Sequence, residues 1–90
     1  MDHTPWTPTL TLETRTGHCR LHLEGITYGN GRDLQEAGTD LLVRLFDLAV
    51  GVRQEGYRLP SGVDPRVPDF LWEIGELALQ GGDLRGRVFG

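Results

Sequence analysis

The sequence predicts an α+β domain, in which a three-stranded antiparallel sheet packs on one long helix and a C-terminal helix follows. Two segments, residues 9–13 and 18–24, alternate apolar and polar side chains with the period of a strand. A third short segment ends in a glycine-rich stretch, and an amphipathic segment of helical period comes next. Strands and helix in this order must fold back on each other to cover their apolar faces.

The first two strands are predicted to form a hairpin around Gly17, which is free to adopt the positive φ of a tight turn. Leu10 and Leu12 lie on one side of the first strand. In the second strand we expect one face toward the core (Cys19, Leu21, Leu23) and one face outward (His18, Arg20, His22, Glu24).

A third strand over residues 26–28 is predicted to break at a glycine turn, residues 29–31. A long helix then begins, with Asp33 as N-cap and Glu36 completing a capping box in which each side chain reaches the other's backbone amide. Gly56 is placed to end this helix. Its predicted apolar face comprises Leu34, Ala37, Leu41, Leu42, Leu45, Leu48, Ala49 and Val52.

A second helix is predicted from near Pro68 to Gln80, because proline is tolerated in the first helical turn. The tail, residues 83–90, is expected either to form a short last strand around residues 87–89 or to be unstructured. The proline-containing segment 1–8 is expected to be an extended arm.

These segments make one predicted domain, residues 1–90, with a β-β-β-α core over residues 9–61 and a C-terminal helix and tail over residues 62–90. A chain of this length buries only about 60–65% of its unfolded surface. Small domains often complete their core by association. We therefore expect a homodimer.

Composition narrows the class of protein. The formal charge is −4, and all nine cations are arginine, which is typical of a GC-rich bacterial genome. An acidic chain of this kind repels nucleic-acid phosphate. The single cysteine indicates a reducing compartment, the first residues show no signal-peptide pattern, and no apolar run reaches the length of a membrane span. We expect a cytoplasmic protein that does not contact a membrane.

The sequence offers no predicted catalytic, cofactor or metal site. On a strand, His18 and His22 lie about 13 Å apart and Cys19 points to the opposite face, which argues against a metal centre. Leu34 stands where a dinucleotide-binding loop needs its third glycine, and Asp33 places a carboxylate where a phosphate would sit. We predict a non-enzymatic domain without a cofactor.

The long helix carries a second apolar strip on its nominally polar side. Val43, Phe46 and Val50 are spaced three and four residues apart and therefore lie next to one another. One interpretation is that the second helix, with Phe70 and Trp72, covers this strip. The other is that the strip, together with Trp72, is an interface with a second subunit or a partner protein.

The residues around the predicted glycine turn resemble a known signature. Residues 31–37, Gly-Arg-Asp-Leu-Gln-Glu-Ala, are similar to the glycine-x-(Thr/Asp)-leucine-glutamate-glutamate-alanine motif of HicB-like antitoxin domains. Residues 55–61, Glu-Gly-Tyr-Arg-Leu-Pro-Ser, are similar to the Gly-x-x-Ile-Pro stretch that follows the helix in that family. The resemblance covers about residues 10–61 and implies three strands leading into one long helix.

The same resemblance implies a protein-binding function, in which an antitoxin occludes a small ribonuclease toxin. HicB antitoxins usually carry a C-terminal DNA-binding module. Residues 62–90 are too few and too acidic for a helix-turn-helix, and they lack the strand-first pattern of a ribbon-helix-helix. The sequence therefore argues against DNA binding. An alternative hypothesis is a stand-alone RNA- or ligand-binding module that uses the sheet face of His18, Arg20 and His22.

Overall fold

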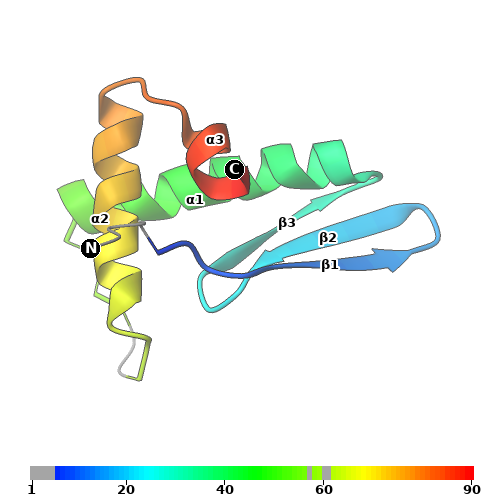
Figure 1. Ribbon diagram of the computed structural model, residues 1–90, viewed down its shortest axis with the longest axis horizontal. Helices are drawn as coiled ribbons and strands as arrows, with labels where there is room; N and C mark the ends of the chain where they lie inside the picture. The colour runs from blue at the N-terminus through cyan, green and yellow to red at the C-terminus, as the bar shows by residue number, and fades with distance from the viewer. Residues whose placement is uncertain (1–5, 57, 60–61) are drawn as a thin grey trace.

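The computed structural model describes residues 6–56, 58–59 and 62–90, and it confirms the α+β fold (Figure 1). One face of a three-stranded sheet is covered by a long helix, and two further helices complete the chain. The elements are β1 (Leu10–Arg15), β2 (His18–Leu23), β3 (Thr27–Gly31), α1 (Leu34–Gln54), α2 (Arg66–Leu79) and α3 (Leu84–Phe89).

The sheet is antiparallel with strand order β1-β2-β3, so β1 and β3 are its two edges. The predicted hairpin is confirmed, since Gly17 adopts a φ of 69° between paired Arg15 and His18. Leu12 lies opposite Leu21, and these leucines face the helix layer. In the described part of the chain no helix is both long enough and apolar enough to cross a membrane.

The predicted glycine turn is wrong, because β3 continues through Gly29 and Gly31. Neither glycine has a positive φ. A Cβ on Gly29 would fall onto the carbonyl oxygen of Ala37 and lie 2.7 Å from the Cα of Leu41. A Cβ on Gly31 would lie 2.5 Å from the backbone nitrogen of Ala37. These glycines therefore allow the backbones of β3 and α1 to touch.

The cap of α1 is partly as predicted. Asp33 accepts a hydrogen bond from the Glu36 amide at 2.8 Å, and Gly56 follows the helix with a φ of 68°. The Glu36 carboxylate, however, accepts from the amide of Arg32 at 3.0 Å rather than from that of Asp33. The capping box is therefore displaced by one residue. Leu34, predicted to lie on the core face, is 53% exposed.

Helix α2 begins at Arg66, two residues before the predicted start at Pro68. The cause is Asp64, whose carboxylate accepts hydrogen bonds from the amide and the guanidinium of Arg66. Pro68 still lies in the first turn, where no intrahelical donor is needed. The core is formed by residues of β2 and of all three helices. Among the described residues it contains no buried polar side chain. Its members are Leu21, Leu23, Ala37, Leu41, Leu45, Ala49, Val67, Phe70, Leu71, Ile74 and Val88.

The tail forms a short helix, α3, instead of the predicted strand or unstructured segment. Asp83 starts it by accepting a hydrogen bond from the Gly86 amide at 2.9 Å. Arg87 then pairs with Glu73 on α2 and donates to the Trp6 carbonyl oxygen at 2.8 Å. Of the predicted arm, residues 1–5 lie outside the described residues, and the described part is packed because the Trp6 ring meets Phe70 edge to face at 6.0 Å.

Candidate functional site

The apolar strip of α1 remains at the surface. Val43 is 54% exposed and Phe46 is 40% exposed, whereas Val50 is half-buried. The interpretation that α2 covers this strip is wrong, because Phe70 points into the core and Trp72 is itself 49% exposed.

The strip reaches α2 through a single arginine. The guanidinium of Arg53, one turn beyond Val50, lies 4.4 Å from the centre of the Trp72 ring and donates to the Trp72 carbonyl oxygen at 3.2 Å. This contact places a charged guanidinium between the α1 end of the strip and Trp72 on α2. We define the strip as Val43, Phe46, Val50 and Trp72.

The outer face of the sheet carries the predicted ligand residues and one aromatic residue that sequence reasoning missed. His18, Arg20 and His22 lie along β2, and Tyr28 on β3 is directly opposite His22. The guanidinium groups of Arg20 and Arg44 lie 4.6 Å and 4.8 Å from the centre of the Tyr28 ring. Strand alternation with the correct β2–β3 register would have revealed Tyr28, but the expected break at residue 29 hid it.

A polar network holds Arg20 and Arg44 in place over the Tyr28 ring. Arg20 donates to the Asn30 side-chain oxygen at 2.9 Å, and the Asn30 amide donates to Asp40 on α1 at 2.8 Å. Arg44 also donates to Asp40, at 2.9 Å. The hydrogen bond from the Asn30 amide, followed by that from Arg44, lowers the pKa of the Asp40 carboxyl below its ordinary value. The ionised Asp40 therefore satisfies the outward amide of Asn30 at the β3 edge.

Beside Arg20 lies a small hollow of about 120 Å³, which is lined by Glu13, Arg15, His18 and Arg20. Glu13 Oε1 and His22 Nε2 are 3.1 Å apart, and this contact is the main cause of the lowered pKa of Glu13. The carboxylate reduces the positive potential of the outer face. Among the described residues, no group of three or more His, Cys, Asp and Glu side chains is arranged to hold a metal ion.

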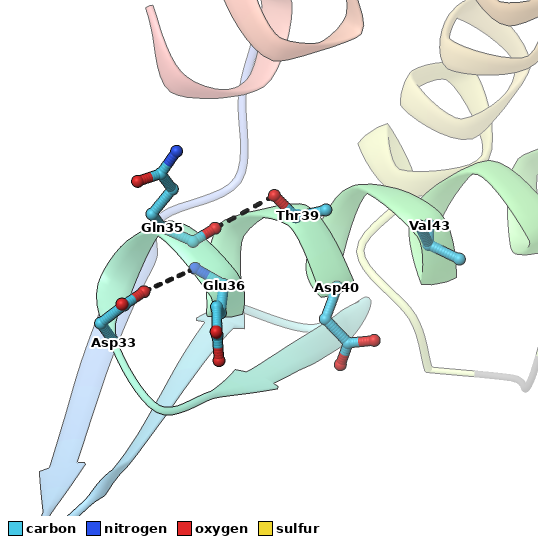
Figure 2. A pocket seen from close by; sticks show the side chains of 6 residues that line it. All are labelled: Asp33, Gln35, Glu36, Thr39, Asp40 and Val43. Carbon is cyan, nitrogen blue, oxygen red and sulfur yellow. Dashed lines mark hydrogen bonds between the residues drawn. The ribbon is translucent and has the colours of Figure 1, made fainter.

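A second hollow, of about 520 Å³, lies along the first turns of α1 (Figure 2). Figure 2 shows Glu36 and Asp40 pointing to the same side of the helix, while Gln35 points to the other. The guanidinium of Arg32 lies 3.0 Å from the Glu36 carboxylate and lowers the pKa of Glu36. The Asp33 carboxylate is the N-cap of α1 and accepts the Glu36 amide. The carboxylates already have partners within the chain, so the hollow offers no free acidic site.

A third hollow, larger than these two, is an apolar groove of about 760 Å³ between β1, the start of α1 and α3. Leu12, 45% exposed, and Leu34 are the exposed large apolar side chains of its lining. Sequence reasoning missed the groove because Leu34 was assigned to the apolar face of the helix and the outer wall, α3, was not predicted. Its lining comprises Leu10, Leu12, Leu21, Leu34, Gln35, Gly38, Arg85 and Phe89.

No protein-family model matches this sequence, and comparisons with curated proteins and with solved structures find no significant match. The HicB-like resemblance of residues 10–61 therefore stays a prediction.

Proposed function

We propose that this chain is a non-enzymatic protein-interaction domain whose strip (Val43, Phe46, Val50 and Trp72) binds a partner protein. The observation that carries the proposal is the exposure of three large apolar side chains, Val43, Phe46 and Trp72, along neighbouring helices. Contiguous exposed apolar surface of this kind is typical of protein-binding sites. Aromatic residues in particular dominate binding energy at the centres of interfaces.

The partner we propose is a small basic protein. The domain carries a net charge of −4, which favours encounter with a cationic surface. Asp47 follows Phe46 in the sequence and is exposed, so it supplies one acidic side chain near the strip, which also has the cation Arg53 beside it. A ribonuclease toxin, occluded as the HicB-like resemblance implies, is the particular form of partner we propose.

Co-expression of the tagged domain with the products of adjacent genes tests this function. We expect a small basic protein to be retained, and Val43→Asp or Phe46→Asp to weaken its retention roughly tenfold or more, since each change places a charge in the buried centre of the contact. Leu34→Asp is the matched control, because Leu34 is 53% exposed at the start of α1, nine residues before Val43 and on the opposite side of that helix. Retention that is unaffected by the strip variants, or no retained protein, would contradict the proposal.

The second candidate function is RNA or ligand binding by the outer sheet face, and Tyr28 is the observation that favours it. The guanidinium groups of Arg20 and Arg44 lie over the partly exposed Tyr28 ring, and guanidinium and aromatic planes together are surfaces on which unpaired bases stack. Fluorescence anisotropy with a short single-stranded RNA at low salt tests it. Binding that Arg20→Ala abolishes and Arg85→Ala leaves intact would support this function, and no binding at low salt would exclude it.

A further inference from the structure

Among the described residues no strand pairs with the outer edge of β1, and the backbone groups that point to this edge follow from the β1–β2 pairing. Glu24 donates its amide to the Thr9 carbonyl oxygen at 2.9 Å, which fixes the phase of the β1–β2 ladder. Because bonded pairs alternate along an antiparallel ladder, Thr11 and Glu13 also direct their backbone groups toward β2. The backbone groups of Leu10, Leu12 and Thr14 are left pointing to the open edge.

This edge borders the apolar groove. Leu10 and Leu12 contribute their backbone to the edge and their side chains to the groove, beside Leu34 and Phe89. An exposed strand edge with an adjacent apolar surface is suited to pairing with another strand. An occupant must therefore supply both backbone hydrogen bonds and apolar side chains on the same face.

A second copy of β1 meets both requirements. We propose that two copies of this domain pair antiparallel through β1, about a two-fold axis at Leu12, to form one six-stranded sheet. Leu12 then lies opposite its own copy, and Leu10 lies opposite Thr14 of the other chain. Each outward N–H and C=O between Leu10 and Thr14 gains a partner, and the two grooves join across the axis.

Charge and the position of a proline favour this register over the two registers with the axis one residue away. An axis at Glu13 would place two carboxylates directly opposite each other, which is destabilising. An axis at Thr11 would pair Thr14 with Pro8, which has no N–H to donate. With the axis at Leu12, Glu13 faces a threonine instead.

The same register brings opposite charges together at both ends of the new contact. Arg15 lies opposite Thr9 of the other copy. In that copy Thr9 is paired with Glu24, so the side chains of Arg15 and Glu24 lie on the same outer face, with Thr9 between them. The two Cα atoms are then about 10 Å apart, within the combined reach of arginine and glutamate. The two-fold axis forms this pair twice. The inference goes beyond the proposed partner binding, because it concerns another surface and a second copy of this chain.

Sedimentation equilibrium of the purified chain tests the pairing. We expect twice the chain mass for the wild type. Leu12→Lys and Thr14→Pro are expected to give monomers, because the first places a charge at the axis and the second removes an outward N–H. Leu79→Lys, an equally exposed leucine on α2, is expected to remain dimeric. Circular dichroism checks that each variant is folded.

Cross-linking tests the register without destabilising the fold. In a Cys19→Ala background, Leu12→Cys is expected to form an intermolecular disulfide under mild oxidation, because the paired Cα atoms would be about 5.5 Å apart. Thr14→Cys is the control and is expected to stay unlinked, since its two copies would be about 14 Å apart.

A monomeric wild type, a dimer that survives Leu12→Lys, or a cross-link at position 14 instead of 12 would each overturn the inference. A monomer whose basic partner is released by Leu12→Lys would show that β1 pairs with a different protein, and it would also overturn self-pairing. A monomer that still binds a partner through the strip would overturn this inference alone and leave the proposed function standing.

Discussion

The two edges of the sheet meet the helix layer in opposite ways. At β3, Gly29 and Gly31 bring the strand backbone against α1, and Asp40 accepts the outward amide of Asn30. At β1, α1 is farther away, α3 forms only a partial wall, and Leu12 remains half exposed over an open groove. One edge is closed by backbone contact, and the other keeps its hydrogen-bonding groups and apolar side chains available.

This difference indicates a division between stability and recognition. The closed edge depends on residues that no larger side chain can replace, so changes there should cost stability. The open edge and the groove contribute less to the fold, so changes there should alter association while the chain stays folded. The following predictions test that division.

The largest effect is expected from Gly29→Ala. Its new Cβ would collide with backbone atoms of Ala37 and Leu41, which cannot rotate away, so β3 and α1 must separate. We expect a loss of about 3 kcal/mol or more in the free energy of unfolding, measured by urea denaturation. That is a large share of the roughly 5–15 kcal/mol typical of a domain.

Gly38→Ala is the matched control on the open side. A Cβ there would meet only the Phe89 ring, at an ordinary 3.6 Å. Because alanine favours a helix over glycine, we expect a gain of about 0.5–1 kcal/mol. A similar loss in both variants would show that the two edges do not differ in packing.

The next effect concerns the wall of the groove. Arg87→Met removes the hydrogen bonds that hold α3 to Glu73, Trp6 and Thr7. We expect a loss of about 1–3 kcal/mol in the free energy of unfolding, because several charge-assisted bonds disappear from a largely buried site. Arg85→Met, on the exposed side of the same helix, should change stability by less than about 0.5 kcal/mol. Equal losses would show that the wall does not depend on Arg87.

A smaller, pH-dependent effect is expected at the closed edge. The pKa of Asp40 is lowered in the folded protein, so its stabilising contribution is complete above its unfolded pKa and disappears as the pH falls through the folded value. Asp40→Asn can still accept the Asn30 amide but carries no charge. We expect the wild type to be more stable than this variant above about pH 5 and the difference to shrink below about pH 4.

Urea denaturation at several pH values measures that difference. Asp47→Asn is its control, since Asp47 lies on the same helix and its exposed side chain forms no hydrogen bond in the described part of the chain. A constant offset between wild type and Asp40→Asn across the whole pH range would contradict a role for the ionised carboxylate.

The smallest effect is a difference in amide hydrogen exchange between the two edges. In the single chain, the Asn30 amide is bonded to Asp40, whereas the outward amides of Leu12 and Thr14 have no partner among the described residues. We expect exchange at Leu12 and Thr14 to be at least about tenfold faster than at Asn30 in dilute protein. Exchange at both residues should slow as the concentration rises and β1 pairs with its copy. Rapid exchange at every concentration would show that the β1 edge does not pair with its copy.

The sequence predicts the hairpin and the long helix well because their signals are local. Strand alternation around Gly17 and the cap at Asp33 depend on residues a few positions apart. The glycines of β3 could not be interpreted in this way. Position 29 needs a glycine because the backbone of α1 touches it. The sequence does not reveal this contact, because a glycine between a strand and a helix predicts a turn.

The candidate surfaces were predictable to different degrees. Helical spacing placed Val43 and Phe46 on one strip, and both are exposed. The groove was not predictable, because its wall is a short helix held by long-range bonds of Arg87 rather than by its own pattern. Tyr28 was missed for a related reason, since its partners Arg20 and Arg44 come from two other elements.

The contacts of Arg87 also have a consequence for the order of folding. They join positions 80 and 81 residues apart, so the chain must close its longest loops before this arginine is satisfied. The hairpin and α1 depend on much shorter separations and can form first. We therefore expect the loss of Arg87 to leave the refolding rate nearly unchanged and to accelerate unfolding, a pattern that stopped-flow kinetics would record.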